Sequence, residues 1–138
     1  MDGIDPIVFA DTTWLVVDAI RDGFTIQGLA VIVDNEVPDD ATRYVVVRRQ
    51  GGPRLDQFRD AAQIRVESIA PTKTEAHDNA QVARAYIQAM RGSVRHGTAI
   101  YRIDELAGPA ELPDPISQLP RYVFTEVVHT RGRALTAP

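Results

Sequence analysis

The pattern of apolar and polar residues predicts four β-strands in this chain of 138 residues. In residues 61–70 the even positions are small or apolar and the odd positions include Gln63, Arg65 and Glu67. This period of two is typical of a strand with one buried face. Residues 43–50 carry three consecutive valines after a tyrosine, which favours a strand that is partly covered on both faces.

The other two strands are predicted at residues 99–106 and 121–131. The first alternates in the same way and is expected to break at Gly108-Pro109, because proline cannot donate to a strand ladder. Further prolines stiffen the connection that follows. A shorter apolar run at residues 29–33 fits either a short strand or an extended linker.

A helix is predicted from Thr72 to Gly92. Thr72 and Glu75 have the spacing of a capping box, in which the carboxylate of Glu75 reaches back to the amide of Thr72. Gly92 favours the end of the helix. Apolar residues recur at steps of three and four, which places on one buried face Ala76, Ala80, Ala83, Ile87 and Met90.

An earlier helix is predicted to begin at Thr12, with Asp11 as its N-cap, and to end at Gly23. The letters ADTTWLVV on their own would also fit a strand. The buried stripe of this helix is expected to contain Trp14, Leu15, Val17 and Ile20.

The expected order of elements is helix, strand, strand, helix, strand, strand. Short connections between neighbouring strands favour antiparallel pairing. The predicted fold class is therefore α+β: a two-layer sandwich in which two helices cover one face of a four-stranded, mainly antiparallel sheet. Residues 1–138 are expected to form one domain, with fraying at Met1–Ile4 and Thr136–Pro138.

Composition narrows the classes of function. The chain contains no cysteine, which excludes disulfides, thiolate nucleophiles and cysteine-ligated zinc. Its net charge of −4 disfavours binding to nucleic acid, whose partners usually carry a clustered basic surplus. No apolar run is long enough to span a membrane, and the first residues lack the pattern of a secretory signal, so the cytoplasm is the expected place of assembly.

Residues that could carry catalysis or bind a metal do not form a recognisable set. The three histidines, His77, His96 and His129, lack a metal-binding spacing and are expected to be solvated at the surface. The acidic residues between 34 and 40 fit a solvated turn better than a calcium loop. Asp104 and Glu105 are adjacent in a predicted strand, so they should point to opposite faces. We expect no cofactor, no metal and no enzymatic activity.

Two loops combine residue types that are typical of protein interfaces. Arginines surround the turn at Gly51-Gly52-Pro53, with an aromatic residue beyond it, although a solvated loop is the alternative. The proline-stiffened connection carries apolar residues that either its own domain or a neighbouring subunit should cover. The candidate interface residues are Arg48, Arg49, Arg54, Phe58, Leu112, Asp114, Ile116 and Leu119.

Residues 43–132 resemble the tail terminator, or tail-completion, proteins of long-tailed actinobacteriophages (siphoviruses). The resemblance is carried by RRQGGP at 48–53, by the alternating strand and alanine-rich helix that follow, and by YRIDELAGPAELPDPISQLPRYVFTEVVHTRG at 101–132. It implies the same two-layer sandwich. It also implies a homohexameric ring that caps the tail tube, stops its polymerisation and presents a surface for head attachment.

The resemblance further implies the partners and the location of the protein. These are the major tail tube protein, a head-completion or connector protein, and genomic DNA that passes through the lumen without specific binding. The expected location is the virion, at the head–tail junction. One alternative is a head–tail connector or other neck subunit. Another is a small oligomeric α+β domain that binds a ligand or catalyses a reaction, which would need convergent polar groups in a pocket.

Overall fold

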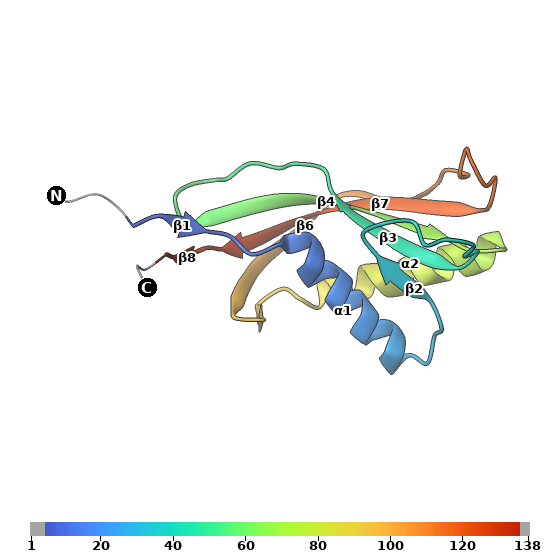
Figure 1. Ribbon diagram of the computed structural model, residues 1–138, viewed down its shortest axis with the longest axis horizontal. Helices are drawn as coiled ribbons and strands as arrows, with labels where there is room; N and C mark the ends of the chain where they lie inside the picture. Colours follow the sequence, from blue (N-terminus) through green and yellow to red (C-terminus); the bar gives the residue numbers. More distant parts are fainter. Residues whose placement is uncertain (1–4, 136–138) are drawn as a thin grey trace.

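The fold is built on a six-stranded sheet, with two helices and a smaller two-stranded sheet (Figure 1). The structure, a computed structural model, describes residues 5–135. The fraying expected for Met1–Ile4 and Thr136–Pro138 therefore lies outside the described residues. The elements are β1 (Ile7–Val8), α1 (Thr12–Ile26), β2 (Ile32–Asp34), β3 (Tyr44–Arg49), β4 (Arg59–Ile69), α2 (Lys73–Gln88), β5 (Ser93–Arg95), β6 (Thr98–Glu111), β7 (Arg121–Arg131) and β8 (Arg133–Ala134).

The predicted four-stranded sheet is wrong. The main sheet has the strand order β2-β3-β4-β7-β6-β5, and β1 pairs with β8 in a separate sheet. The main sheet is mixed, because β2 runs parallel to β3 while the other neighbouring strands are antiparallel. The strands outside the predicted four contain two or three residues each, and one of them, β2, overlaps the apolar run at 29–33 that fitted either a short strand or a linker. An alternating pattern cannot distinguish so short a strand from a loop.

Strand β6 is also longer than predicted. It continues through Gly108-Pro109 to Glu111 instead of breaking there. Its pairing with β7 shifts register around these residues. A bulge of this kind accommodates Pro109, because β5 pairs only with residues 98–100 of β6 and the other edge of β6 is unpaired at the proline. The predicted strand at 121–131 is confirmed as β7.

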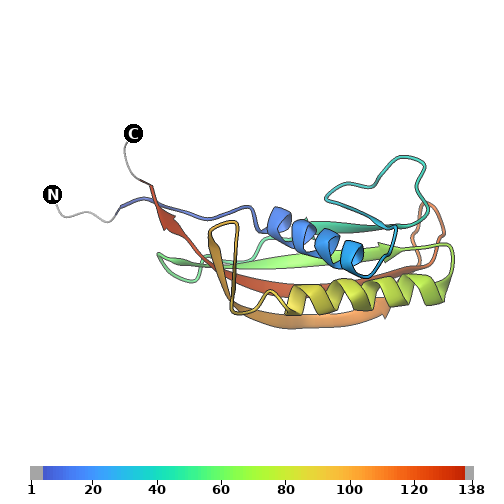
Figure 2. The ribbon, with the colours of Figure 1, turned by 90° about the horizontal axis from the view of Figure 1, so that it is seen from below.

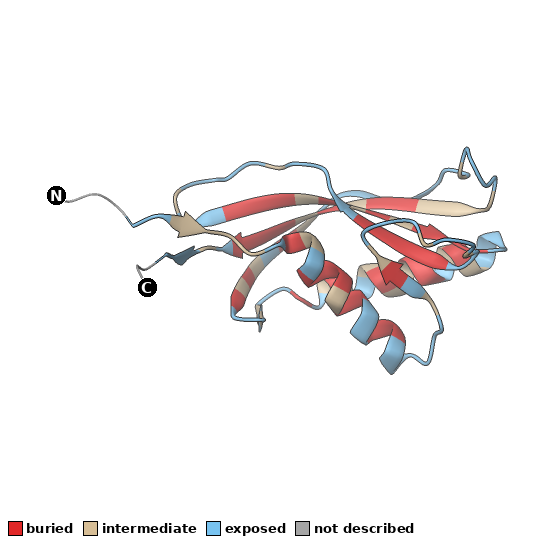
Figure 3. Cartoon of the chain, in the orientation of Figure 1, coloured by how far each residue is buried: buried red, intermediate tan, exposed pale blue. Residues whose placement is uncertain are grey.

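Both helices lie on one face of the main sheet (Figure 2). No helix formed by residues 5–135 covers the opposite face, which we call the open face. Figure 3 shows the buried residues concentrated between the helices and the central strands. The largest core side chains include Phe24, Phe124, Leu15, Ile20 and Ile64, each at most 2% exposed.

Helix α1 begins as predicted and ends later. The side chain of Asp11 accepts a hydrogen bond from the amide of Trp14 at 3.2 Å, which confirms the N-cap. The helix continues through Gly23 to Ile26. A side chain at position 23 would collide with the ring of Tyr86 on α2, so the glycine permits close packing of the two helices. Trp14 was expected in the buried stripe but is 47% exposed.

Helix α2 ends at Gln88 instead of the predicted Gly92, but its predicted stripe is buried, including Met90, which lies just beyond the helix. Its N-cap is Thr72, whose hydroxyl accepts a hydrogen bond from the amide of Glu75 at 3.2 Å. The carboxylate of Glu75 forms an ion pair with Arg43, just before β3, instead of the predicted return contact. The residues of the stripe are all buried: Ala76, Ala80, Ala83, Ile87 and Met90.

Candidate functional site

The two candidate loops lie at opposite ends of the main sheet. The distal loop, residues 50–58, leads into β4, and the proline loop, residues 112–120, leads into β7. Strands β4 and β7 pair along their whole length of 11 residues. At the usual rise per residue this ladder is about 35 Å long. The structure therefore separates the candidate interface residues into two groups.

Arg49 is committed to its own subunit. Its guanidinium forms a bidentate ion pair with Asp60, at 2.9 and 3.2 Å, and the Asp60 side chain is only 6% exposed. It also donates to the backbone carbonyls of Gly51 and Gly52. Arg48, the preceding residue, is exposed, and its side chain forms no hydrogen bond or ion pair with residues 5–135. The two adjacent arginines therefore have different roles.

Glycine is required in the RRQGGP turn. Gly52 has φ +96°, a conformation that favours glycine, and a Cβ there would collide with the backbone of Ala61 on β4. The close approach lets the turn continue the ladder, because Gln63 donates to Gly51 and Ala61 donates to Pro53. The first part of the distal loop thus runs beside β4.

The rest of the distal loop binds the side chain of Arg54 through its own carbonyls, and both Arg54 and Phe58 stay exposed. Arg54 donates to the carbonyls of Asp56 and Gln57, and its guanidinium lies 5.1 Å from the ring centroid of Phe9. Hydrogen bonds from the amide of Phe58 and from Arg59 lower the pKa of Asp56. Phe58 is 46% exposed.

The proline loop is held rigidly by its own hydrogen bonds. Asp114 accepts from the amide and the hydroxyl of Ser117, which lowers its pKa. Leu112 donates its amide to Arg121, and the Arg121 side chain donates back to the carbonyl of Leu112 at 2.7 Å. Asp114 therefore shapes the loop.

The sequence left open whether the apolar residues of the proline loop are covered by their own domain or by a neighbouring subunit. The structure places them in two different environments. Leu119 packs against a small cluster of its own subunit, formed on the open face by Tyr44, Val46 and Ile69. Ile116 is 92% exposed and Leu112 is 48% exposed. The domain itself covers one of the three side chains and presents the other two to solvent.

Glu126 is a buried carboxylate that the sequence reading missed. It lies on β7 facing the helices, with no exposed surface, and one oxygen accepts from Gln88 of α2 at 3.2 Å. Its other oxygen has no hydrogen-bond partner among residues 5–135. Burial raises the pKa of Glu126 to about 7, opposed by the hydrogen bond from Gln88. Strict alternation along residues 121–131 would have revealed it, because position 126 shares the inward parity of Phe124.

The histidines are more involved in the fold than expected. His129 is only 7% exposed, and its Nε2 lies 2.9 Å from Asp104 on the open face. His96 contacts Asp18 of α1 at 2.6 Å. Asp104 and Glu105 do point to opposite faces, since Glu105 pairs with Arg84 of α2.

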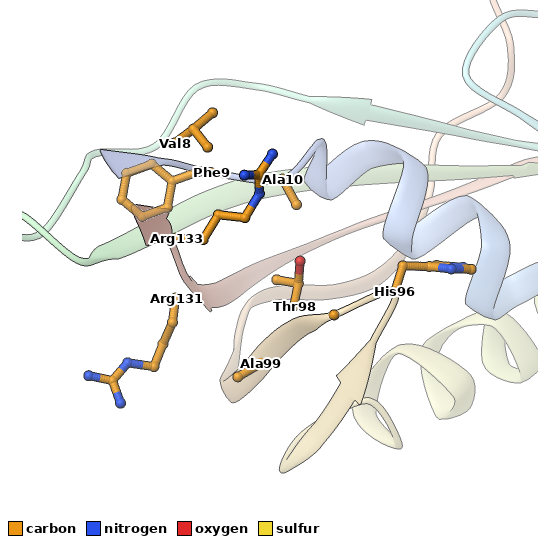
Figure 4. A pocket seen from close by; sticks show the side chains of 10 residues that line it. Val8, Phe9, Ala10, His96, Thr98, Ala99, Arg131 and Arg133 are labelled. Atoms are coloured by element: carbon orange, nitrogen blue, oxygen red, sulfur yellow. The ribbon is translucent and has the colours of Figure 1, made fainter. Parts of the chain in front are cut away.

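A cleft of about 470 Å³ lies between the β1–β8 ribbon and the β5–β6 hairpin (Figure 4). Val8, Phe9 and Arg133 line one side and His96 and Thr98 the other. The lining offers a hydroxyl on Thr98 and an imidazole on His96, but no hydrogen bond within residues 5–135 joins these two side chains, and His96 contacts Asp18 instead.

Two further features are absent from residues 5–135. No cluster of three or more histidine, cysteine or acidic residues is placed to hold a metal ion. Neither of the described helices has the length and apolar character needed to cross a membrane.

Comparisons with known proteins relate the fold to a virion. No protein-family model and no curated protein sequence matches the chain. A solved structure described as the virion of a native gene transfer agent particle contains a chain with a matching fold. The two chains are 17% identical, with a TM-score of 0.53, and the match covers 85% of this chain and 92% of that one. At this level of identity the shared property is the fold.

Proposed function

We propose that this protein is a structural subunit of a phage virion, and more specifically the tail terminator. In this role it forms a hexameric ring at the head–tail junction, which caps the tail tube and stops its polymerisation. The ring presents a surface to a head-completion or connector protein, and genomic DNA passes through its lumen without specific binding. Assembly takes place in the cytoplasm of the bacterial host.

The observation that carries the virion role is the fold shared with a chain of the gene transfer agent virion. The finer assignment to the tail terminator rests on the sequence resemblance of residues 43–132. The positions of the candidate loops suit this assignment. A closed ring uses heterologous interfaces, which need two different surfaces on each subunit, and the two loops lie at opposite ends of β4.

Tail-tube length is the direct test of this proposal. The tail-tube protein of the same phage, purified and allowed to polymerise, is expected to give shorter tubes of narrow length distribution when this protein is added. Electron microscopy of negatively stained tubes should show a ring at one end of each. Unchanged tubes together with binding to purified connectors would instead identify a neck subunit.

The proline loop gives a more local prediction. Replacing Leu112 and Ile116 with serine is expected to prevent ring formation while changing the free energy of unfolding by less than about 0.5 kcal/mol, because both side chains are largely exposed. Size-exclusion chromatography with light scattering measures the assembly. The matched control replaces Ile26 and Val94, which are 71% and 70% exposed elsewhere on the surface. Rings that persist in the Leu112 and Ile116 variant would remove the proline loop from the interface.

A further inference from the structure

Charge is distributed unevenly along the chain. Residues 1–42 contain nine acidic residues and one basic residue, whereas residues 43–138 contain ten acidic and fourteen basic residues. The net charge of −4 therefore conceals two regions of opposite sign. The fold determines where the charged side chains of each region lie on the surface.

The open face gathers the arginines. Side chains that share this face are identified by the strand register, because directly paired residues of antiparallel strands point to the same side. Among the described residues 5–135, the acidic residues of the strands whose side chains share the open face are Glu67 and Asp104. Its arginines are Arg48, Arg59, Arg65, Arg102, Arg121 and Arg131.

Internal ion pairs balance some of this positive charge. Glu67 contacts Arg65 at 3.0 Å, and Asp104 contacts Arg102 at 2.9 Å. Arg48 and Arg131 are exposed, and neither side chain has an ion pair or hydrogen bond with residues 5–135. The open face thus keeps cationic groups that nothing in the described subunit neutralises.

The acidic segment, residues 34–40, begins at the last residue of β2 and continues into the connection between β2 and β3, at one edge of the same sheet. Glu36, Asp39 and Asp40 are exposed, and no side-chain hydrogen bond or ion pair joins them to residues 5–135. Val37 between them is 52% exposed. The segment therefore offers unpaired carboxylates beside an apolar side chain.

We propose that the open face of one subunit receives the acidic segment of the next copy of this chain. The inference rests on the ring of the proposed function and specifies charged groups in the contact that repeats between neighbouring subunits. Opposite charges on two different surfaces favour a head-to-tail contact and set its register, and they disfavour pairing of like surfaces. The apolar Val37 adds a side chain that the contact can bury.

A second copy fits the open face better than duplex DNA does. Proteins that hold DNA by charge commonly neutralise about six to ten phosphates. On this face Arg59 pairs with Asp56, and Arg121 pairs with Glu67. That leaves Arg48 and Arg131 as the arginines of the face without an acidic or hydrogen-bonding partner in the described structure. The acidic segment, with the three unpaired carboxylates of Glu36, Asp39 and Asp40, is much closer to that number.

Two charge-reversal variants test the proposal. The face variant carries Arg48→Glu and Arg131→Glu, and the segment variant carries Glu36→Arg and Asp39→Arg. Asp40 is left unchanged because its φ of +54° is unfavourable for most side chains. Each variant alone is expected to associate at least about tenfold more weakly than the wild type, because each brings like charges together.

The equimolar mixture of the two variants provides the decisive measurement. In the face variant alone both contact surfaces are negative, and in the segment variant alone both are positive. In the mixture, the segment of each variant is opposite in charge to the face of the other variant, so rings with alternating subunits are expected to form. The control variant carries Arg91→Glu and Arg133→Glu, which changes the charge equally at two exposed arginines outside the open face. It is expected to assemble as the wild type does. Light scattering reads the mass, and raising the salt to about 1 M should weaken wild-type assembly.

The outcomes separate this inference from the proposed function. Wild-type rings that survive both charge reversals would overturn the charged interface and leave the terminator role intact. A wild type that neither forms rings nor caps tubes contradicts both.

A short mixed-sequence DNA duplex, followed by fluorescence anisotropy, is the remaining probe. Duplex binding that the face variant loses, with its assembly unchanged, would show that the open face contacts nucleic acid and would also overturn the proposal.

Discussion

Replacing Arg49 with alanine is expected to lower the free energy of unfolding by about 3 kcal/mol, because it leaves the buried carboxylate of Asp60 without its partner. The substitution also removes two hydrogen bonds to the carbonyls of Gly51 and Gly52, which hold the turn beside β4. Urea denaturation followed by circular dichroism measures the effect. Thermal unfolding should shift downward in parallel.

Arg48→Ala is the matched control for this prediction. The side chain is the same and lies one position away, but it is exposed and makes no intramolecular ion pair with residues 5–135. Its effect should stay within about 0.5 kcal/mol. In a double-mutant cycle, Asp60→Asn should recover part of the Arg49→Ala loss, since the buried charge is gone. Equal effects at Arg48 and Arg49 would contradict the assigned clamp role.

Replacing Glu126 with glutamine is expected to stabilise the protein above pH 7 and to flatten its stability profile below that pH. The native pKa of Glu126 is raised to about 7 from 4.5. Between these values the unfolded chain has lost the proton and the folded protein keeps it, so stability falls as pH rises. The loss is complete above the folded pKa and is about 3 kcal/mol in total.

The measurement is the free energy of unfolding of the wild type and of Glu126→Gln from pH 4 to pH 8. Subtracting one profile from the other removes the contribution of the other titrating groups. The difference should be small at pH 4, grow through the window and level off above pH 7. Glutamine keeps the oxygen that accepts from Gln88, so packing at the site is preserved. A difference that does not vary with pH would show that Glu126 does not titrate in this range.

The interface candidates show how far residue type alone can be used. Arginines and exposed aromatic residues are typical of interfaces, and on this basis Arg48 and Arg49 were equivalent. The structure distinguishes them, because successive residues of a strand point to opposite faces and only Arg49 shares a side with Asp60. For the same reason, a test of assembly should replace Arg48 and leave Arg49 in place.

In the proline loop, too, residue type alone did not tell which side chains are covered by their own subunit. Its prolines and apolar residues indicated a stiff loop that something must cover, and sequence spacing could not say what. The hydrogen bonds of Asp114 fix the loop so that Leu119 turns toward its own subunit and Ile116 points to solvent. That difference depends on contacts with β3 and β4, which are distant in the sequence.

The sequence by itself determined the elements whose signals are local. The N-cap and buried stripe of helix α2, the N-cap of α1, the alternating strand β4 and the boundaries of β7 follow from signals within a few positions of each other. The tertiary structure decided the width of the sheet, because β2, β5 and the β1–β8 ribbon are too short to form without a paired neighbour. It also decided the electrostatics: burial gives Glu126 its raised pKa, and strand register gathers on one open face arginines that are scattered along the chain.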